Sequence, residues 1–497
     1  MREGQGHAPV EHVDVLVVGA GLSGISAAWH LQSMMPTRSY AILEARERMG
    51  GTWDLFRYPG IRSDSDMYTL GYRFQPWRNA KAIADGPSIR GYIEDTAREH
   101  GIDRRIRYRH RLVRASWHSP SARWTVDLEV GDDRRTVQLT CGFLYSCTGY
   151  YDYDAAHRPE WPGLDRFRGE VVHPQFWPDS LRYAGKRVVV IGSGATAVTL
   201  VPAMATGPDA AAHVTMLQRS PTYIAVLPSE DAMANRLRRL LPDRAAYALA
   251  RWKNVLRSMF YYRVARSRPA VFKRALRADA ARLLGADFPV DEHFAPRYEP
   301  WDERLCMIPD GDLFHALREG RASIVTDQIA HFDETGIVLT SGRRLDAEVV
   351  ITATGLRMSL LTGVAMEVDG VPVSFGERFV YKGMMLDGVP NFAAAVGYTN
   401  ASWTLKCDLI AQHVCRLLRH MARRGYAQVT PTRPSALVPR PVFDFTSGYV
   451  QRALSSLPRQ GDRAPWRLYQ NYVLDLLSLR YGRVAEADLT FTRPVTG

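Results

Sequence analysis

The stretch VDVLVVGAGLSG, residues 13–24, decides the fold of this chain. The letters VDVLVV are typical of a buried β-strand, and they lead directly into Gly19, Gly21 and Gly24. The alanine-rich residues that follow, to about Leu31, predict a helix. A strand, a glycine-rich turn and a helix in this order predict a nucleotide-binding unit. The glycines let the backbone approach a pyrophosphate, and the helix N-terminus attracts its charge.

The next strand supplies an acid at the position that such a unit requires. Residues 40–43, YAIL, predict this strand, and Glu44 follows it, 20 residues after Gly24. A carboxylate placed there accepts hydrogen bonds from the ribose hydroxyls of a dinucleotide. Gly19, Gly21, Gly24 and Glu44 are therefore candidate cofactor-binding residues.

A second unit begins with the strand KRVVVI and continues into Gly192, Gly194 and Ala197. Its following strand ends in Arg219 and Ser220, where the first unit has an acid. An acid would repel the 2′-phosphate of NADPH, whereas an arginine forms charge-assisted hydrogen bonds with it. We therefore predict that these five residues bind NADPH in preference to NADH.

Two dinucleotide sites in one chain indicate redox chemistry. NADPH would supply a hydride, and FAD in the first unit would store it and react with the second substrate. The five cysteines form no CxxC pair, which argues against a disulfide reductase, and no spacing typical of metal ligands. Oxygen, a quinone or another electron carrier remains as the acceptor, and no metal is expected.

The two units lie about 170 residues apart and predict an α/β fold with two Rossmann-like dinucleotide-binding domains, one for FAD and one for NADP. Leucine and aromatic residues at helical spacing predict a helical insertion in the second domain. The expected organisation is a discontinuous FAD-binding domain at residues 1–155 and 330–430, an NADPH-binding domain at 156–329 with the insertion at about 231–298, and a C-terminal tail at 431–497 that packs on the domains.

The net charge of +12 is concentrated in one segment. Residues 236–282 contain 14 Arg and Lys against Asp243 and Asp279, so this segment alone has a net charge of +12. A solvated helical face is the simplest interpretation, and peripheral contact with an anionic membrane is the alternative. Nucleic-acid binding is not expected, because no nucleic-acid-binding motif accompanies the charge.

Other features favour a cytoplasmic protein. The sequence has no run of 18 apolar residues, so no membrane span is expected. The polar first nine residues lack the apolar region of a signal peptide. Cysteines without a disulfide pattern also fit a reducing compartment.

A set of residues before the second unit resembles a known family. Phe167, Gly169, His173, Trp177 and Pro178 match every fixed position in the fingerprint of the Baeyer–Villiger monooxygenases, which are flavoproteins. The fingerprint also lies where that family carries it, just before the second nucleotide motif. The related flavin-containing monooxygenases usually differ at the last two positions.

A second signature extends this resemblance. It consists of GGTW, then YPG at residues 58–60, then Asp64. It implies that Gly51, Thr52 and Trp53 of GGTW contribute to the FAD site together with Asp64. Four more segments resemble the ethionamide-activating monooxygenases of mycobacteria: Trp252–Asn254, Pro300–Cys306, Gly397–Lys406 and Pro465–Leu468.

The resemblance implies a reaction and the residues that carry it. FAD reduced by NADPH would react with O2 to give a C4a-peroxyflavin, which converts a ketone to an ester or lactone, with S-oxidation of thioethers or thioamide prodrugs as a side activity. The anionic peroxide needs a fixed positive charge and the exclusion of water. The resemblance assigns this charge to Arg304, held by Asp64, and assigns His173 to the coupling of NADPH binding with domain motion. A structural salt bridge and a structural histidine are the alternatives.

One residue departs from the family pattern. Many relatives have lysine immediately before the active-site arginine, whereas this chain has Glu303. Arg219 and Ser220 would then recognise the phosphate alone, and selectivity for NADPH would be weaker. Two other functions stay open: a flavin-containing monooxygenase that oxidises N or S atoms, and an electron-transfer flavoprotein reductase that serves a protein partner. The expected partners are otherwise O2 and a small ketone or thiocarbonyl compound, and the oligomeric state is not predicted.

Overall fold

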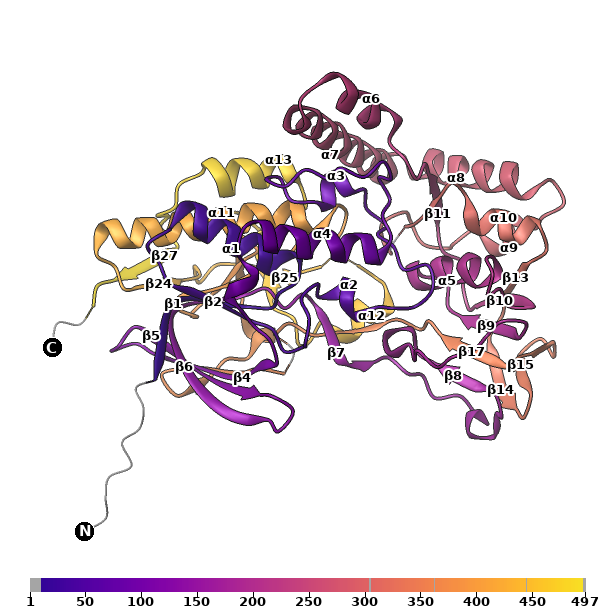
Figure 1. Ribbon diagram of the computed structural model, residues 1–497, viewed down its shortest axis with the longest axis horizontal. Helices are drawn as coiled ribbons and strands as arrows, with labels where there is room; N and C mark the ends of the chain where they lie inside the picture. Colours follow the sequence, from indigo (N-terminus) through magenta and orange to yellow (C-terminus); the bar gives the residue numbers. More distant parts are fainter. Residues whose placement is uncertain (1–9, 304, 362, 444, 495–497) are drawn as a thin grey trace, which may run out of the picture.

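The computed structural model describes residues 10–303, 305–361, 363–443 and 445–494. It confirms the expected α/β class: two units, one with a mixed sheet and one with a parallel sheet, lie side by side along the long axis of the molecule (Figure 1). The helices α6 (Ala232–Leu240) and α7 (Asp243–Ser267) rise above them. Within these described residues, no helix combines the length and the apolar content that a membrane-spanning segment needs.

The first unit is built around β1 (Glu11–Val18), which pairs in parallel with β2 (Tyr40–Leu43) and β6 (Arg135–Ser146). The glycine turn after β1 leads into α1 (Leu22–Met34), three residues longer than expected, and α1 packs against α11 (Trp403–Arg424). The sheet runs in the order β20 (Val371–Pro372), β19 (Ala365–Val368), β4 (His110–His118), β5 (Arg123–Val130), β6, β1, β2 and β3 (Ile106–Arg107), and β23 (Phe392–Ala394) pairs with β6.

The second unit is a five-stranded parallel sheet. Its order is β13 (Ala322–Thr326), β10 (His213–Gln218), β9 (Arg187–Ile191), β17 (Val349–Thr352) and β8 (Glu170–Val172), and α5 (Ala195–Ala205) follows β9. The predicted domain boundary at residue 330 is therefore wrong, because β17 pairs with β9 and β8 and extends this unit to residue 352. The sheet that a strand joins is decided by its distant partners, which the local sequence does not reveal.

Two neighbouring strands carry the chain from the first sheet to the second and back again. β7 (Tyr151–Ala156) carries the chain into the second unit, and β18 (Leu356–Met358) carries it back. The two strands pair antiparallel, with Leu356 opposite Ala156. This short ribbon joins the two sheets.

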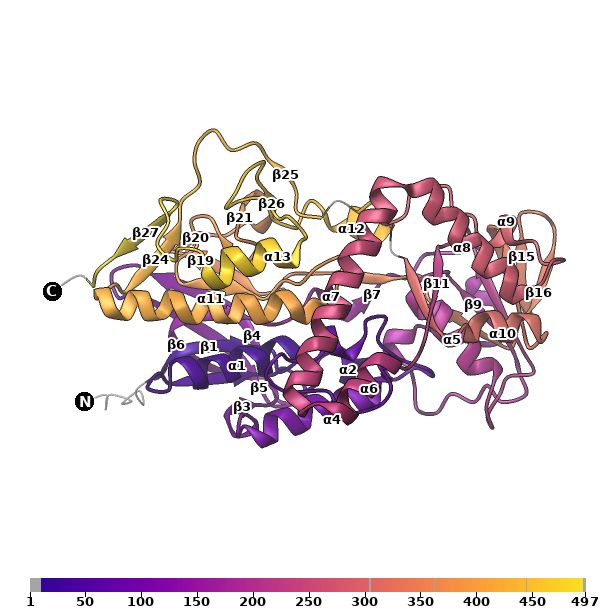
Figure 2. The ribbon, with the colours of Figure 1, turned by 90° about the horizontal axis from the view of Figure 1, so that it is seen from above.

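The predicted insertion is helical, and its helices belong to different cores. α6, α7, α8 (Pro269–Leu284) and α9 (Val290–His293) make up most of it. Val255 of α7 lies in the hydrophobic core of the first unit, whereas Leu284 of α8 lies in the core of the second. Figure 2 shows α7 turning into α8 above the junction of the two units.

A buried arginine fixes α7 to the first unit. Arg251 is 5% exposed, and its Nη1 donates hydrogen bonds of 2.7 Å to the carbonyl oxygens of Tyr68 and Gly71. These carbonyls belong to the end of α3 (Met67–Leu70), where helical hydrogen bonding stops and backbone acceptors need other donors. Replacing Arg251 would leave these acceptors without their donor.

The C-terminal tail also packs on the first unit. Trp466 and Tyr472 are buried in the same core as β1. β27 (Leu489–Thr492) pairs antiparallel with β24 (Gln428–Pro431). The tail thus completes the hydrophobic core on this side of the molecule.

Candidate functional site

One cavity of about 1220 Å³ lies between the two units. It is larger than the roughly 300–1,000 Å³ of most small-molecule sites, so it has room for more than one ligand. The first glycine motif, α7 and α8 all contribute residues to its wall. Thr196 and Thr199 of α5 line it from the second unit. The cavity is therefore the candidate active site.

The three glycines of the first motif serve two purposes. Gly19 has a φ of +105°, and a Cβ there would lie 2.6 Å from the carbonyl oxygen of Cys147. A Cβ on Gly24 would lie 1.9 Å from the carbonyl oxygen of Gly19. The packing of β1, β6 and α1 therefore requires both glycines. Gly21 lines the cavity, and a Cβ there would make only an ordinary 3.5 Å contact with Gly51. A pyrophosphate at the N-terminus of α1 explains glycine at this position.

Glu44 is held in one orientation at the end of β2. It is 6% exposed and lines the cavity. Its Oε2 accepts a hydrogen bond from the Ala20 N–H at 2.9 Å, and its Oε1 accepts one from the Arg46 N–H at 2.9 Å. Burial raises the pKa of Glu44, and the two backbone N–H groups oppose this shift. Each oxygen keeps acceptor capacity, which fits a pair of ribose hydroxyls.

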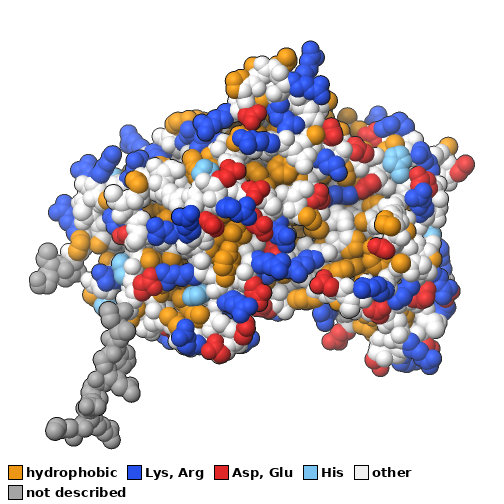
Figure 3. Space-filling view, viewed as in Figure 1, with side chains coloured by type: hydrophobic (Ala, Val, Ile, Leu, Met, Phe, Trp, Pro, Cys, Tyr) orange, Lys and Arg blue, Asp and Glu red, His pale blue; other side chains and the backbone are white. Residues whose placement is uncertain are grey.

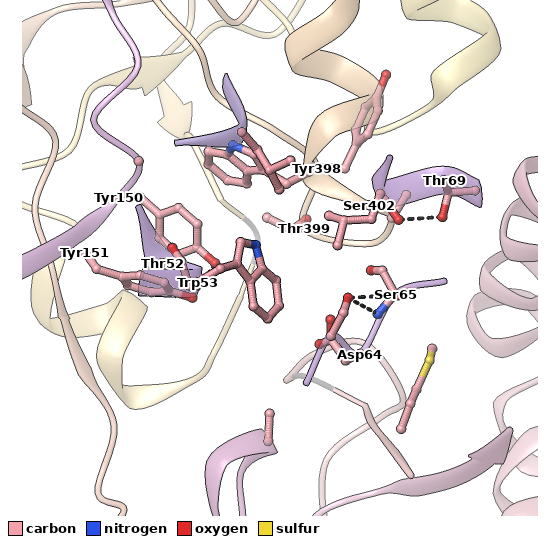
Figure 4. A pocket seen from close by; sticks show the side chains of 18 of the residues that line it. Thr52, Trp53, Asp64, Ser65, Thr69, Tyr150, Tyr151, Tyr398, Thr399 and Ser402 are labelled. Atoms are coloured by element: carbon pink, nitrogen blue, oxygen red, sulfur yellow. Dashed lines mark hydrogen bonds between the residues drawn. The ribbon is translucent and has the colours of Figure 1, made fainter. Parts of the chain in front are cut away.

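The residues of the second family signature come together at the cavity wall. Gly51, Thr52 and Trp53 lie at the start of α2 (Thr52–Leu55) and line the cavity with Asp64. Figure 4 shows the Trp53 indole between Tyr150 and the carboxylate of Asp64. Thr69 and Ser402 also line the cavity, and their hydroxyls are 2.6 Å apart. Gly51, Thr52, Trp53 and Asp64, which the resemblance assigns to the FAD site, therefore line one cavity, and their contact with FAD stays a prediction.

Arg304 lies outside the described residues. The chain on either side of it reaches the cavity, because Trp301, Leu305 and Met307 all line the wall. The catalytic assignment of Arg304 therefore stays a prediction from the resemblance.

The second nucleotide motif lies at the edge of the cavity. Gly192, Gly194, Arg219 and Ser220 follow the carboxyl ends of β9 and β10, which pair in parallel, so they share one edge of the sheet. None of them is among the described residues that line the cavity, and Ala197 is buried in α5. A Cβ on Gly194 would meet no atom within 4 Å. The protein itself does not require glycine there, whereas a closely bound pyrophosphate would.

Arg219 and Glu303 lie close to each other although they are far apart in the sequence. Arg219 is exposed at the end of β10. Burial raises the pKa of Glu303, and the positive charge of Arg219 opposes this shift. The residue that departs from the family pattern therefore acts electrostatically on the predicted phosphate-binding arginine.

A glycine of the first unit allows its backbone to pack closely against α5. Gly60 of the YPG segment has a φ of +76°, and a Cβ there would lie 2.6 Å from the Ala203 Cβ and 3.0 Å from the Thr199 carbonyl oxygen. Next to it, burial raises the pKa of Tyr58 to about 12, and a hydrogen bond with Thr196 opposes the shift. The YPG segment is therefore a contact between the units.

The residues around His173 connect the second sheet to the crossing strand β7. His173 Nδ1 accepts a hydrogen bond of 3.2 Å from the Gln175 N–H, and Gln175 Nε2 donates one of 2.8 Å to the Asp152 carbonyl oxygen. A Cβ on Gly169 would lie 2.5 Å from the Glu348 carbonyl oxygen. His173 is not among the described residues that line the cavity. The fingerprint therefore lies at the junction of the units.

Acid is expected to destabilise the protein through His173. Burial lowers the pKa of His173 from its ordinary 6.5 to about 4. Between these pH values, His173 binds a proton in the unfolded chain but not in the folded protein. The contribution of the neutral imidazole to stability is therefore fully present above pH 6.5 and is lost as the pH falls towards 4. The loss of stability attributable to this residue is on the order of 2 kcal/mol, because solvent screening reduces the roughly 1.4 kcal/mol that each pKa unit represents. Chemical denaturation across this range measures it. His173→Asn should reduce the loss, whereas His118→Asn, at an exposed position on β4, should not. Equal pH profiles for all three proteins would contradict the prediction.

The sequence does not predict the aromatic part of the cavity wall. Tyr150, Tyr151, Tyr398 and Trp403 all line it. The Tyr150 and Tyr151 hydroxyls are 2.5 Å apart, and the Tyr150 ring centroid lies 4.6 Å from that of Trp403. Aromatic side chains are also common in hydrophobic cores, so the sequence does not show which of them line a cavity. Trp403 does fall within a segment that resembles the family.

Comparison with known proteins gives the family. Residues 17–83 match the model of NAD(P)-binding Rossmann-like domains, and residues 83–252 match that of flavin-binding monooxygenase-like proteins. The chain is 54% identical over 484 residues to the FAD-containing monooxygenase EthA of Mycolicibacterium smegmatis, and 52% identical to EthA of Mycobacterium tuberculosis. Both alignments cover 97% of this chain and 98% of the relative.

Solved structures support the same fold. An oxidised steroid monooxygenase bound to NADP matches with a TM-score of 0.73 at 24% identity, and an open structure of cyclohexanone monooxygenase with a TM-score of 0.74 at 18% identity. Each match covers 97% of this chain and 100% of the other. The predictions of two dinucleotide-binding domains, of FAD and of a flavoprotein monooxygenase are thereby confirmed. With relatives more than half identical along almost its entire length, the chain belongs to the family of FAD-containing monooxygenases.

Proposed function

We propose that this protein uses NADPH and O2 to insert an oxygen atom beside the carbonyl group of a ketone, giving an ester or lactone. The observation that supports this best is the cavity between the two units, which joins the first glycine motif, Trp53 and Asp64 to α5 of the second unit. Such a cavity can bring a nicotinamide, a flavin and a substrate together. The same oxygen transfer extends to soft sulfur atoms, so thioethers and thioamides are the expected secondary substrates.

The residues present fit both cofactors. Gly21 and the N-terminus of α1 would hold the FAD pyrophosphate, and Glu44 would hold its ribose. Gly194 would let the NADPH pyrophosphate approach α5, and Arg219 would bind the 2′-phosphate. FAD, when bound, supplies electron storage and the activation of O2.

The chain itself supplies charge and shielding. An arginine keeps its positive charge at any working pH and can stabilise the negative charge that develops on oxygen. We assign this role to Arg304 and assign its positioning to Asp64, because Asp64 and the neighbours of Arg304 line one cavity. The aromatic wall formed by Tyr150, Tyr151 and Trp403 would exclude water and so limit the release of hydrogen peroxide.

His173 is assigned a positioning role. It is buried next to the ribbon that joins the two sheets, and its neighbour Gln175 bonds the backbone of β7. A shift of the second sheet on binding NADPH would therefore be transmitted to the crossing strand. This role requires no proton transfer by the imidazole.

A substrate panel tests the proposed reaction. The holoenzyme would be supplied with NADPH, isotopically labelled O2 and linear ketones, cyclic ketones or thioethers, and NADPH consumption and product masses would be measured. Esters that carry one labelled oxygen are expected. N- or S-oxides without any ester would favour a flavin-containing monooxygenase. NADPH oxidation that depends on an added protein acceptor would favour an electron-transfer reductase.

Arg219→Ala is expected to weaken the use of NADPH much more than the use of NADH. Arg219 would pair with the 2′-phosphate, which NADH lacks, and hydrogen bonds to a charged group contribute about 1.5–3 kcal/mol. The specificity constant for NADPH should therefore fall by about 10- to 100-fold, and that for NADH should change little. Comparing kcat/KM for the two cofactors measures this, and equal losses would remove Arg219 from phosphate recognition.

Glu303→Lys is expected to strengthen the binding of NADP+, whereas Arg219→Ala weakens the use of NADPH. The substitution replaces a negative charge near Arg219 with a positive one, so NADP+ should bind more tightly, by about tenfold at low salt and less at high salt. The measurement is a titration of NADP+ against flavin absorbance. Glu292→Lys, at an exposed position on α9, adds the same charge elsewhere and is the control. Equal gains in both variants would show a general effect of net charge.

We further propose a cytoplasmic location with peripheral membrane contact through the basic segment at residues 236–282. The helices α6 and α7 of this segment rise above the rest of the molecule (Figure 1), and the segment carries a net charge of +12. An anionic lipid surface attracts such a segment.

A further inference from the structure

An apolar stripe runs along the solvent-facing side of α7. Leu249, Trp252, Leu256 and Phe260 are spaced by three, four and four residues, so they lie on one face of the helix. They are between 42% and 65% exposed. A surface helix normally turns its apolar stripe inwards, yet α7 is fixed with this stripe outwards by the buried Arg251.

A second apolar stripe lies beside the first. Leu474, Leu477 and Tyr481 are spaced by three and four residues in α13 (Tyr472–Asp475) and the π-helix η5 (Leu476–Tyr481) that continues it. They are between 44% and 65% exposed. Figures 1 and 2 both show α13 next to α7, and the ring centroids of Trp252 and Tyr472 are 5.8 Å apart. We call these seven exposed residues of the two stripes the α7–tail surface.

Basic residues accompany the α7–tail surface. Arg236, Arg239 and Arg244 are exposed near the start of α7, and Arg263 is exposed near its end. The chain contains no Asp or Glu from Arg244 to Ala278. In Figure 3, hydrophobic side chains lie beside Lys and Arg at the top of the molecule, over α6 and α7. Apolar groups with a basic rim, including Trp and Tyr, are typical of a surface that inserts into an anionic lipid interface.

The α7–tail surface borders the opening of the cavity. Phe260, the last residue of the first stripe, lines the cavity and is 65% exposed. Arg263 and Arg268 are also exposed cavity-lining residues, and Val271 joins them from α8. The cavity therefore opens between α7 and α8, next to the apolar stripe.

We propose that the α7–tail surface docks on an anionic lipid bilayer, and that lipophilic substrates pass from this bilayer into the cavity between α7 and α8. The docking depends only on the surface, whereas the passage of substrate rests on the proposed function. The apolar stripes enter the interface, and the arginines contact the anionic headgroups. A membrane-held ketone then reaches the cavity without crossing water.

Vesicle co-sedimentation of the holoenzyme tests the docking. Vesicles of phosphatidylcholine alone and of phosphatidylcholine mixed with phosphatidylglycerol are compared at low and high salt. Binding is expected with phosphatidylglycerol only and should weaken with salt. The Leu249→Ser/Leu256→Ser double variant should bind at least about tenfold more weakly, because two exposed leucines lose their apolar surface. Neither leucine is among the described residues that line the cavity.

A matched double variant is the control. Val371→Ser/Val438→Ser changes two exposed apolar residues outside the α7–tail surface and should bind as the wild type does. Equal losses in both double variants, or binding that ignores phosphatidylglycerol, would overturn the proposal. The sedimentation of the protein without vesicles is measured in parallel. Self-association that only the leucine variant abolishes, with no vesicle binding, would make this surface an interface between copies of the chain.

Turnover separates docking from substrate entry. With a long-chain ketone held in vesicles, the leucine variant should lose at least about tenfold in rate, while its rate with a short, water-soluble ketone stays unchanged. Equal rates of wild type and variant with the vesicle-held ketone would overturn entry from the bilayer. If the wild type binds vesicles but oxidises neither ketone, the proposed function fails while the docking stands.

Discussion

Replacing Arg304 with alanine is expected to stop ester formation while the protein still binds FAD and oxidises NADPH. A fixed positive charge stabilises the negative oxygen that develops during the reaction, and alanine removes this charge. The loss of one such preorganised donor lowers rates by about 10²- to 10³-fold. The measurement compares ester mass with NADPH consumption and hydrogen peroxide release, and the missing ester should appear as peroxide.

Two further variants make this result specific. Arg304→Lys keeps the charge but loses the planar guanidinium, so it should retain part of the activity. Arg274→Ala removes a charge from an exposed position on α8 and should leave ester formation unchanged. A normal rate of ester formation in Arg304→Ala would end the role assigned to this residue.

Gly24→Ala is expected to yield a protein that is unstable and loses its flavin. An added Cβ would lie 1.9 Å from the carbonyl oxygen of Gly19, which is backbone and cannot move aside as a flexible side chain could. Either β1 or α1 must shift, and overpacking of this kind costs about 1–3 kcal/mol or more. The same shift displaces the N-terminus of α1, where the pyrophosphate would bind. The flavin-to-protein absorbance ratio and chemical denaturation measure the two effects.

Gly91→Ala is the matched control for this substitution. Gly91 lies within α4 (Gly86–Glu99), and a Cβ there would meet no atom within 4 Å. Alanine in a helix interior is favoured over glycine by about 0.5–1 kcal/mol, so this variant should keep its flavin and gain stability. A normal flavin content in Gly24→Ala would show that the backbone contact adapts.

The nucleotide motifs could be predicted from sequence because their geometry is local. The strand, turn and helix of residues 11–34 follow from the apolar run and the glycines alone, and Glu44 falls at the end of β2 as expected. The position of Asp64 beside Trp53 was accessible only through the resemblance, because nothing in the spacing brings these residues together.

Other features depend on contacts that the local sequence does not encode. β17 looks like any buried strand, and only its pairing with β9 places it in the second unit. The electrostatic contact between Arg219 and Glu303 arises because two distant segments converge at one edge of the second sheet. The aromatic cavity wall could not be predicted either, because its residues come from segments that are far apart in the sequence.

The division of two consecutive helices between the two cores has a mechanical consequence. α7 is held in the first unit by Arg251, whereas α8 packs on the second unit, and the chain between them bends at Arg268. Rotation of one unit against the other would therefore pivot at this bend and change the width of the gap between α7 and α8. The cavity would keep one stationary wall and one moving wall, so the aperture for substrate would be set by the angle between the units.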